Sequence, residues 1–281
     1  MTWDSGPGTA VVTGASSGIG AEYAGQLAVR GWDLVLVARR DERLTALRDE
    51  VRGRTRDTVE VETLVADLSR PDDLARVARR VAAQDVSLLV NNAGINGYGP
   101  FTEAEPELLA KVVEVNVVAP TALSRAALPG MLARGRGAVI NVASLLAFAG
   151  GLPPGPLPHR AVYGGTKGYV VTFTRTLAAE LAGTPVRVQV VCPGLTATEF
   201  HLGRGETPVP GAPRTHDDGG MPAADVVTAS LAALSAGEVV CVPGLRDASA
   251  VDRLAAAELG LRDGSGPSLA SRYRTVEHPG A

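Results

Sequence analysis

The sequence predicts one α/β domain built around a doubly wound, seven-stranded parallel sheet. Short apolar segments rich in β-branched residues alternate strictly with longer helical patterns along most of the chain. A glycine-rich turn joins the first apolar segment to the first helix, which is typical of a phosphate-binding unit. With 281 residues, of which 45% are hydrophobic, the chain can bury one large core.

The elements follow one another in a regular order. The expected strands are residues 10–12, 34–37, 59–65, 86–90, 138–142, 186–191 and 239–242. The expected helices after the first are residues 41–52, 71–84, 103–133, 163–181 and 223–234. We place the core at about residues 9–244 and a C-terminal tail at about 245–281, which is helical at 251–259 and then polar.

The first strand leads into a turn that is suited to a pyrophosphate. Glycines let the backbone turn tightly and approach a phosphate, and the N-terminus of the next helix supplies unpaired N–H groups. That helix carries Ala21, Ala24, Leu27 and Ala28 on its apolar positions, and strand 34–37 then completes a Rossmann-like βαβ unit. The turn residues expected at the coenzyme are Gly14, Ser16, Ser17, Gly18, Ile19 and Gly20.

The end of the second strand indicates which coenzyme is bound. A carboxylate there would bind the ribose 2′-hydroxyl of NAD, whereas an arginine accepts the 2′-phosphate of NADP. The chain has Arg39 and Arg40 at this place, so NADP(H) is favoured. NAD(H) remains possible because Asp41 follows directly, although a carboxylate also suits the N-terminus of the helix that begins there.

Polar residues follow the next two strands at the same edge of the sheet. We expect Asp67 and Leu68 at the adenine; alternatively, Asp67 helps to start the next helix together with Ser69. Asn91 and Asn92 precede Ala93 and Gly94 after the fourth strand, where they suit a strand-to-loop turn with or without a ligand. We assign Asn92, Ala93 and Gly94 to the coenzyme site.

A tyrosine and a lysine begin the fifth long helix. Tyr163 and Lys167 are four residues apart, so their side chains lie on one face. A neighbouring ammonium favours the phenolate and lowers the pKa of a tyrosine, which would let Tyr163 exchange a proton with a carbonyl or alcohol oxygen. Ser144 follows strand 138–142 and is expected to reach the same crevice.

Two segments break the alternation of helices and strands. Residues 150–159 contain four prolines and must form a loop. Residues 195–221 are rich in glycine and proline and follow strand 186–191, so we interpret them as a lid over the substrate. The candidate pocket residues are Asn96, Tyr98, Leu146, Leu195, Phe200 and His201.

Together the motifs resemble the compact, single-domain branch of the short-chain dehydrogenase/reductase superfamily over roughly residues 9–244. The motifs that carry the resemblance are TGASSGIG, NNAG, the serine after the fifth strand, YGGTK and the PG at 193–194, in the expected order. The resemblance implies hydride transfer between a nicotinamide and a carbonyl or alcohol carbon, in a homodimer or homotetramer.

The resemblance also implies roles for single residues. Tyr163 would be the proton donor, Lys167 would lower its pKa and bind the nicotinamide ribose, and Ser144 would orient the substrate. Asn116, in the helix that also carries Pro120, would hold a water that links Lys167 to solvent; alternatively it is a helix asparagine tolerated near a kink. The residues implied at the nicotinamide carboxamide are Pro193, Gly194 and Thr196, with Thr198 as the alternative hydroxyl.

Two features depart from the family pattern. Ser144 precedes Tyr163 by nineteen residues, which is a longer gap than usual, and the excess is the proline-rich loop. Gly164, Gly165 and Gly168 stand where alanine is more typical, and each lowers helix propensity by about 1 kcal/mol. We therefore expect the start of this helix to be loose until coenzyme binds.

Composition excludes several other classes of protein. The 27 basic and 30 acidic residues provide no basic surface for nucleic acid, and apolar runs fall short of the roughly 18 residues that a membrane span needs. Two cysteines, four histidines without ligand spacing and the lack of a signal pattern favour a cytoplasmic protein without a bound metal.

Alternatives to the oxidoreductase are a cyclase, dehydratase or epimerase on this fold, or an NADPH-sensing regulator. The intact set of Asn116, Ser144, Tyr163 and Lys167 disfavours the non-redox enzymes, and the retained tyrosine and lysine disfavour the regulator.

Overall fold

The computed structural model describes residues 8–155, 157–201 and 220–274, and it divides the chain into two compact units. The first unit ends at Gly244 and contains the large sheet, and the second unit begins at Leu245. Within the described ranges no helix is both long enough and apolar enough to cross a bilayer.

Seven parallel strands form the sheet of the first unit in the order β3-β2-β1-β4-β5-β6-β9. The chain starts in the middle of the sheet, runs out to one edge, returns to β4 and continues to the other edge. This is the predicted doubly wound topology, and it brings the carboxyl ends of all strands to one side. The strands are β1 (Thr9–Thr13), β2 (Asp33–Ala38), β3 (Val61–Val65), β4 (Val86–Asn91), β5 (Gly137–Val142), β6 (Val186–Val191) and β9 (Val240–Cys241).

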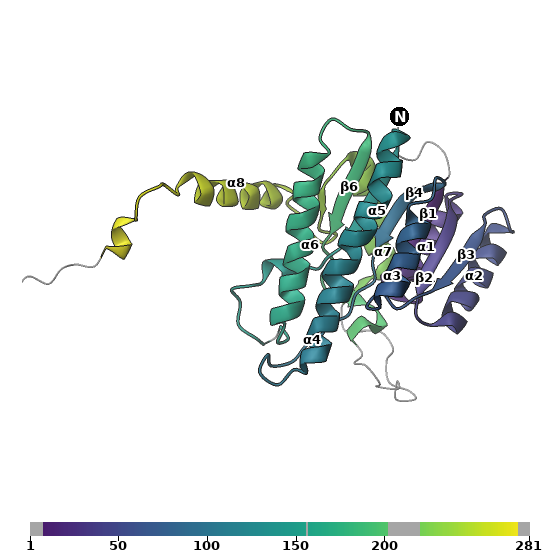
Figure 1. Cartoon of the computed structure of the whole chain (residues 1–281), viewed down its shortest axis with the longest axis horizontal. Helices are drawn as coiled ribbons and strands as arrows, with labels where there is room; N and C mark the ends of the chain where they lie inside the picture. Colours follow the sequence, from purple (N-terminus) through teal and green to yellow (C-terminus); the bar gives the residue numbers. More distant parts are fainter. Residues whose placement is uncertain (1–7, 156, 202–219, 275–281) are drawn as a thin grey trace, which may run out of the picture. The chain divides into compact units, whose positions relative to one another are not determined.

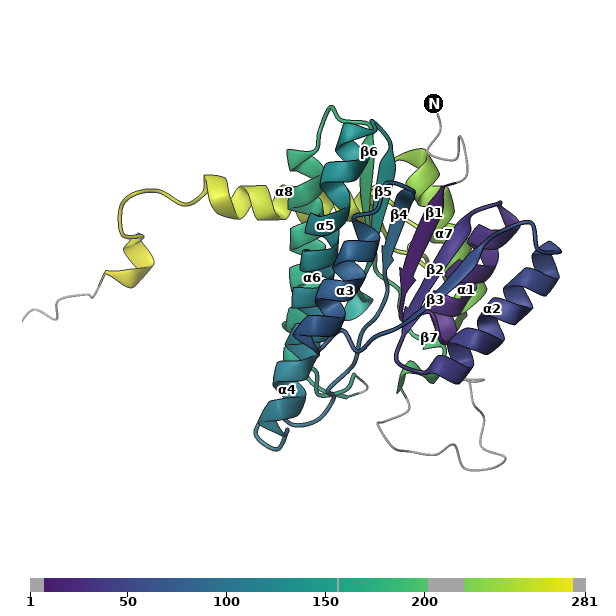
Figure 2. The same cartoon turned by 45° about the vertical axis from the view of Figure 1, so that its right-hand side comes forward.

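Helices cover both faces of the sheet (Figures 1 and 2). Successive side chains of a strand point to opposite faces, so Val11 packs into one core and Ala10 and Val12 into the other. The first core lies under α3 (Pro71–Val81), α5 (Ala119–Ala133) and α6 (Ala161–Glu180). The second lies under α1 (Gly18–Val29), α2 (Asp41–Thr55) and α7 (Ala223–Ala236). Because both faces are covered, the strands are apolar nearly throughout.

The helix expected at residues 103–133 consists of three segments. It begins as α4 (Pro106–Val113), widens into the π-helical turn η1 (Glu114–Val118) and continues as α5. A proline suits the first turn of a helix, which explains the start at Pro106. Pro120 has no N–H to donate to the carbonyl of Asn116, and we attribute the π turn to this missing bond.

The segment expected to form a lid is described only in part. Its described residues form β7 (Thr196–Ala197), the 3₁₀ turn η3 (Glu199–His201) and β8 (Met221–Pro222), and β7 pairs with β8. Residues 202–219 lie outside the described part of the chain.

The second unit contains α8 (Ser249–Asp263) and the 3₁₀ turn η4 (Ser271–Tyr273). The helix is longer at both ends than the expected 251–259, and none of its residues is buried.

Candidate active site

Tyr163 and Ser144 meet at the carboxyl edge of the sheet, in spite of the long interval between them. Tyr163 lies in the first turn of α6 and is buried, and the side chains of Ser144 and Tyr98 are close enough to its hydroxyl to shift its pKa. Ser144 caps the 3₁₀ turn η2 (Leu145–Phe148), because its Oγ accepts a hydrogen bond of 3.1 Å from the N–H of Leu146. The structure therefore brings the two predicted hydroxyls together.

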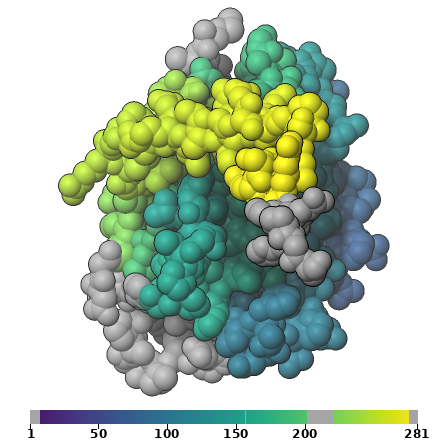
Figure 3. All heavy atoms as spheres, turned by 90° about the vertical axis from the view of Figure 1, so that its left-hand side faces the viewer, coloured from purple at the N-terminus to yellow at the C-terminus, as the bar shows by residue number. Residues whose placement is uncertain are grey.

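Arg160 explains how the proline-rich loop is accommodated. Its buried guanidinium donates to the carbonyl of Ala149 at 2.6 Å, of Leu152 at 2.8 Å and of Pro158 at 3.0 Å. Residues 150–155 are exposed, and Figure 3 shows the loop at the surface in teal. Arg160 thus ties the two ends of the loop together, so the extra residues extend outward without separating Ser144 from Tyr163. Sequence reasoning missed this role; an arginine two residues after the last of the four prolines is the only signal for it.

Lys167 lies one turn after Tyr163, on the same face of α6. Its side chain is buried, its Nζ donates to the carbonyl of Val142 at 2.8 Å, and Nζ is 5.6 Å from the centroid of the Tyr163 ring. Burial lowers the pKa of Lys167 to about 8. A Cβ atom on Gly94 would lie 3.5 Å from Nζ and 3.3 Å from Oδ1 of Asn116, so a glycine gives these side chains room.

The pKa of Tyr163 corrects one expectation from the sequence. Burial raises this pKa, the nearby Tyr98 raises it further, and the hydrogen bond from Ser144 only partly offsets them. Nζ of Lys167 donates to the carbonyl of Val142 and not to the phenol, and the pKa of Tyr163 stays raised. The predicted lowering of the Tyr163 pKa by Lys167 is therefore wrong for the geometry of these residues alone.

Asn116 is held firmly within the π turn. It is buried, its Oδ1 accepts from the N–H of Ile95 at 3.0 Å, and its Nδ2 donates to the carbonyl of Ile95 at 2.9 Å and to Oγ1 of Thr166 at 3.1 Å. Asn116 therefore joins the loop after β4 to α6. These bonds give Asn116 a structural role beyond that of an asparagine tolerated near a kink. Its implied role in holding a water stays a prediction.

The glycine turn is tightly packed against the residues after β4. A Cβ on Gly20 would overlap the carbonyl oxygen of Gly14 and approach Nδ2 of Asn92 to 2.5 Å. Nδ2 of Asn92 donates to the carbonyl of Thr13 at 2.9 Å, and Oγ1 of Thr13 accepts from the N–H groups of Asn92 and Ala93, both at 3.0 Å. Thr13 is thus a bracing residue that sequence reasoning missed. Gly14, with φ of 67°, has a backbone conformation that favours glycine.

The start of α1 has the properties of an anion site. Its N-cap is Ser17, and none of the described side chains caps the first N–H groups. Helix N-termini with free N–H groups attract phosphate. Together with the tight glycine packing, this indicates that the turn fits a dinucleotide pyrophosphate.

Arg40 lies directly over the glycine turn. Its Nη2 donates to Oγ of Ser16 at 2.8 Å and to Oγ of Ser17 at 2.9 Å. Its neighbour Arg39 is exposed, and Asp41 lies in the first turn of α2, as expected for a carboxylate there. The structure therefore places one of the two predicted arginines against the predicted phosphate-binding hydroxyls.

The residues predicted at the adenine have structural partners of their own. One carboxylate oxygen of Asp67 accepts from N–H and Oγ of Ser69, and the other accepts from Nζ of Lys111 at 3.2 Å. Although burial raises the pKa of Asp67, these bonds lower it to about 2. The side chain of Leu68 is buried in the core beneath α3. The alternative role of Asp67, which involves Ser69, is thus present in the structure, and contact with the adenine stays a prediction.

The segment after β6 reaches both the serine loop and the glycine turn. The carbonyl of Pro193 accepts from the N–H of Leu145 at 2.9 Å, and Oγ1 of Thr196 donates to the carbonyl of Gly194 at 3.1 Å. Thr198 lies against Gly18, where an added Cβ would approach Cγ2 of the threonine to 2.9 Å. These predicted coenzyme residues therefore contact both the loop that follows Ser144 and the glycine turn.

Two aromatic rings lie against the ring of Tyr163. The ring of Tyr98 meets the Tyr163 ring edge-on with centroids 5.2 Å apart, and the Phe200 ring lies at 5.9 Å. Nδ2 of Asn96 donates to the carbonyl of Phe200 at 3.0 Å, and burial raises the pKa of Tyr98 to about 12. Three predicted pocket residues are thus gathered here. The side chain of His201 lies outside the described part of the chain.

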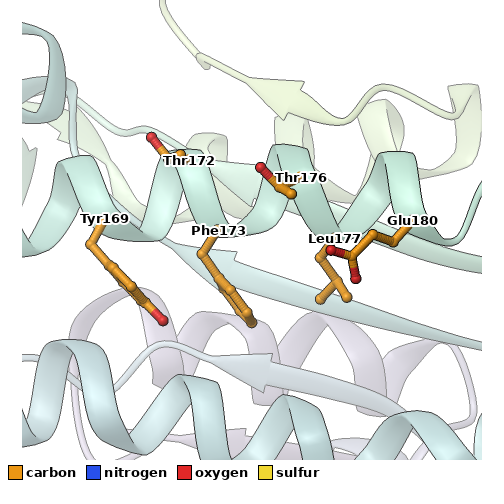
Figure 4. Close-up of a pocket in the computed structure, with 6 residues that line it drawn as sticks. All are labelled: Tyr169, Thr172, Phe173, Thr176, Leu177 and Glu180. Atoms are coloured by element: carbon orange, nitrogen blue, oxygen red, sulfur yellow. The ribbon is translucent and has the colours of Figure 1, made fainter.

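A separate hollow of about 250 Å³ lies on the outer face of α6 (Figure 4). The rings of Tyr169 and Phe173 stack there with centroids 5.7 Å apart, and Thr172, Thr176, Leu177 and Glu180 complete the lining. At about 100° per residue, Tyr169, Thr172 and Thr176 lie on the opposite side of the helix from Tyr163 and Lys167, and none of the lining residues is a candidate site residue. The hollow is therefore not part of the candidate active site.

Comparison with known families agrees with this geometry. The family model described as short chain dehydrogenase matches residues 8–207. The chain belongs to this family. The resemblance predicted from the motifs is thereby confirmed, as is the parallel α/β sheet that members of the short chain dehydrogenase family share with this chain.

Three relatives illustrate the similarity. Very-long-chain 3-oxoacyl-CoA reductase of Anas platyrhynchos is 36% identical over 205 residues, which are 69% of this chain and 62% of that protein. A short-chain dehydrogenase from Sphingobium yanoikuyae in complex with NADPH has a TM-score of 0.84 and 36% identity, over 95% of this chain and 100% of that chain. The bulky-bulky ketone specific alcohol dehydrogenase from Comamonas testosteroni has a TM-score of 0.81 and 32% identity, over 95% and 98% of the two chains. The chain spans 55% to 62% of the length of the curated relatives that it matches.

Proposed function

We propose that this chain is an NADP(H)-dependent oxidoreductase that interconverts a ketone or aldehyde and the corresponding alcohol. The observation that carries the proposal is the buried Tyr163 hydroxyl, which lies beside Ser144 and one helical turn from Lys167. Two donors close together at the carboxyl edge of the sheet suit a single substrate oxygen.

The chain's own residues fit a nicotinamide dinucleotide. A Cβ at Gly20 would fill the turn, the N-terminus of α1 offers N–H groups, and Arg40 provides a cation beside Ser16 and Ser17. When bound, the coenzyme supplies or accepts the hydride. NADP(H) is proposed over NAD(H) because a guanidinium over the turn suits a 2′-phosphate. The relative from Sphingobium yanoikuyae, which is in complex with NADPH, supports this preference.

Protons move at the hydroxyl of Tyr163. In the reducing direction its O–H donates to the carbonyl oxygen, and Ser144 holds that oxygen by a second hydrogen bond. The raised pKa keeps the phenol protonated, so the proton to be donated is present on Tyr163. In the oxidising direction, the oxygen of Tyr163 accepts the proton of the alcohol.

The substrate is proposed to be a ketone with an apolar group. The rings of Tyr98 and Phe200 both lie against the ring of the reacting phenol, so they can pack against hydrocarbon or aromatic parts of a substrate. The Comamonas testosteroni relative is named for bulky ketones and the Anas platyrhynchos relative for 3-oxoacyl thioesters, which supports the same class. We also infer that the protein is cytoplasmic and forms a homodimer or homotetramer.

A carbonyl screen tests the function. Purified protein is incubated with NADPH and a panel of aliphatic, aromatic and polycyclic ketones, and the loss of reduced-nicotinamide absorbance is followed. Tyr163→Phe should bind NADPH like the wild type while turnover falls by about 10²–10⁴. Unchanged turnover in this variant would refute the role of Tyr163. NADPH binding without oxidation by any carbonyl would favour the non-redox enzymes or the regulator.

A further inference from the structure

The short turn η3 contacts two parts of the proposed site at once. Its first residue, Glu199, places Oε2 2.6 Å from Nη1 of Arg43 and 3.7 Å from Nη1 of Arg40. Its second residue, Phe200, packs against the ring of Tyr163, and its carbonyl accepts from Asn96. Adjacent residues of one turn thus connect the arginines over the glycine turn with the catalytic phenol.

The arginines form a site with excess positive charge. The pKa of Arg40 is lowered by burial and by the charges of Arg43 and Arg39, while Glu199 opposes this effect. A cluster of guanidiniums beside Ser16 is suited to a dianionic phosphate, which would satisfy several N–H donors together. Glu199 supplies a single carboxylate to the same donors.

We propose that Glu199 is a specificity-determining residue for the coenzyme: it competes with a 2′-phosphate for Arg40 and Arg43, and its displacement loosens the turn that holds Phe200 against Tyr163. The proposal rests on the proposed NADP(H) function. NADH has no 2′-phosphate and leaves the pairs of Glu199 in place. NADPH releases Glu199 and so frees the aromatic side of the substrate pocket.

The expected change in NADPH affinity follows from how exposed the ion pairs of Glu199 with Arg40 and Arg43 are. The side chains of Arg40, Arg43 and Glu199 are 44%, 45% and 32% exposed, so each pair is screened by solvent. Removing the carboxylate charge should therefore tighten NADPH binding by about twofold to fivefold. The gain should shrink as ionic strength rises, because it is electrostatic.

Coenzyme titrations test the competition. Dissociation constants for NADPH and NADH are measured at low and high salt for the wild type, Glu199→Gln and the control Glu42→Gln. Glu42 lies in the first turn of α2, and its replacement makes the same change in net charge; the described part of the chain shows no ion pair for it. We expect tighter NADPH binding at low salt for Glu199→Gln alone, with NADH unchanged. Equal or weaker NADPH binding in Glu199→Gln, or the same gain in Glu42→Gln, would overturn the proposal.

Hydrogen exchange tests the link to Phe200 without any substrate. Adenosine 2′,5′-bisphosphate should speed amide exchange in residues 196–201 of the wild type, whereas adenosine 5′-monophosphate should not. In Glu199→Gln the exchange should be fast already and respond to neither nucleotide. The same response to both nucleotides, or none to the bisphosphate, contradicts the link. If the wild type binds neither NADPH nor NADH, the proposed function is overturned as well. If the wild type binds NADPH and Glu199→Gln behaves like the wild type, only the role of Glu199 is overturned.

Discussion

Adding one methyl group at two helical glycines should have opposite effects. At Gly20, in the first turn of α1, a Cβ overlaps the carbonyl oxygen of Gly14 and comes within 2.5 Å of Nδ2 of Asn92. At Gly165, in the first turns of α6, a Cβ meets no atom within 4 Å. The pair of variants Gly20→Ala and Gly165→Ala therefore separates packing from helix propensity.

The expected changes in the free energy of unfolding follow from these contacts. Alanine favours a helix over glycine by about 1 kcal/mol, and Gly165→Ala should raise the free energy of unfolding by up to that amount. In Gly20→Ala the same gain is exceeded by overlap costs of about 1–3 kcal/mol and by the loss of the bond from Asn92 to Thr13, worth about 1 kcal/mol. We expect the two variants to differ in stability by about 2–4 kcal/mol.

Urea unfolding and NADPH titration provide the measurements. Gly20→Ala should also weaken NADPH binding at least about tenfold, because the displaced Asn92 no longer braces the turn. Gly165→Ala should bind NADPH normally, and its amides from 163 to 168 should exchange more slowly if the helix start is loose. A Gly20→Ala protein that is as stable as the wild type and binds NADPH equally well would refute the steric reasoning.

Three further variants test other contacts of the site. Arg40→Ala should weaken NADPH binding more than NADH binding in titrations, and equal losses would remove the 2′-phosphate argument. Arg160→Met leaves three loop carbonyls without their buried donor, so urea unfolding should show a loss of about 1.5–3 kcal/mol, and an unchanged stability would refute its tie across the loop. Because the pKa of Lys167 falls from 10.5 to about 8 on folding, the unfolded chain binds more protons between these pH values. The stability of the wild type relative to Lys167→Met should therefore rise from pH 8 to 10.5, and a flat or falling difference would contradict the burial of this ammonium.

The sequence by itself determined the fold and the local parts of the site. Alternating helical and apolar segments specify a parallel sheet, because each strand must be covered on both faces. The glycine turn and the spacing of Tyr163 and Lys167 depend on neighbouring residues, so they can be read from a short window. Arg40 could be predicted at the coenzyme because the carboxyl end of a strand in this topology lies at the ligand edge.

Only the tertiary structure decided how these parts affect one another. Arg160, Thr13 and Glu199 act on groups that are brought to them by other elements, and nothing in their own sequence windows states which carbonyl, amide or guanidinium they will meet. The pKa of Tyr163 is raised because burial and Tyr98 outweigh the hydrogen bond from Ser144, and burial is a property of the whole fold. Short-range patterns thus placed the reactive groups along the chain, whereas long-range packing set their charge states and their partners.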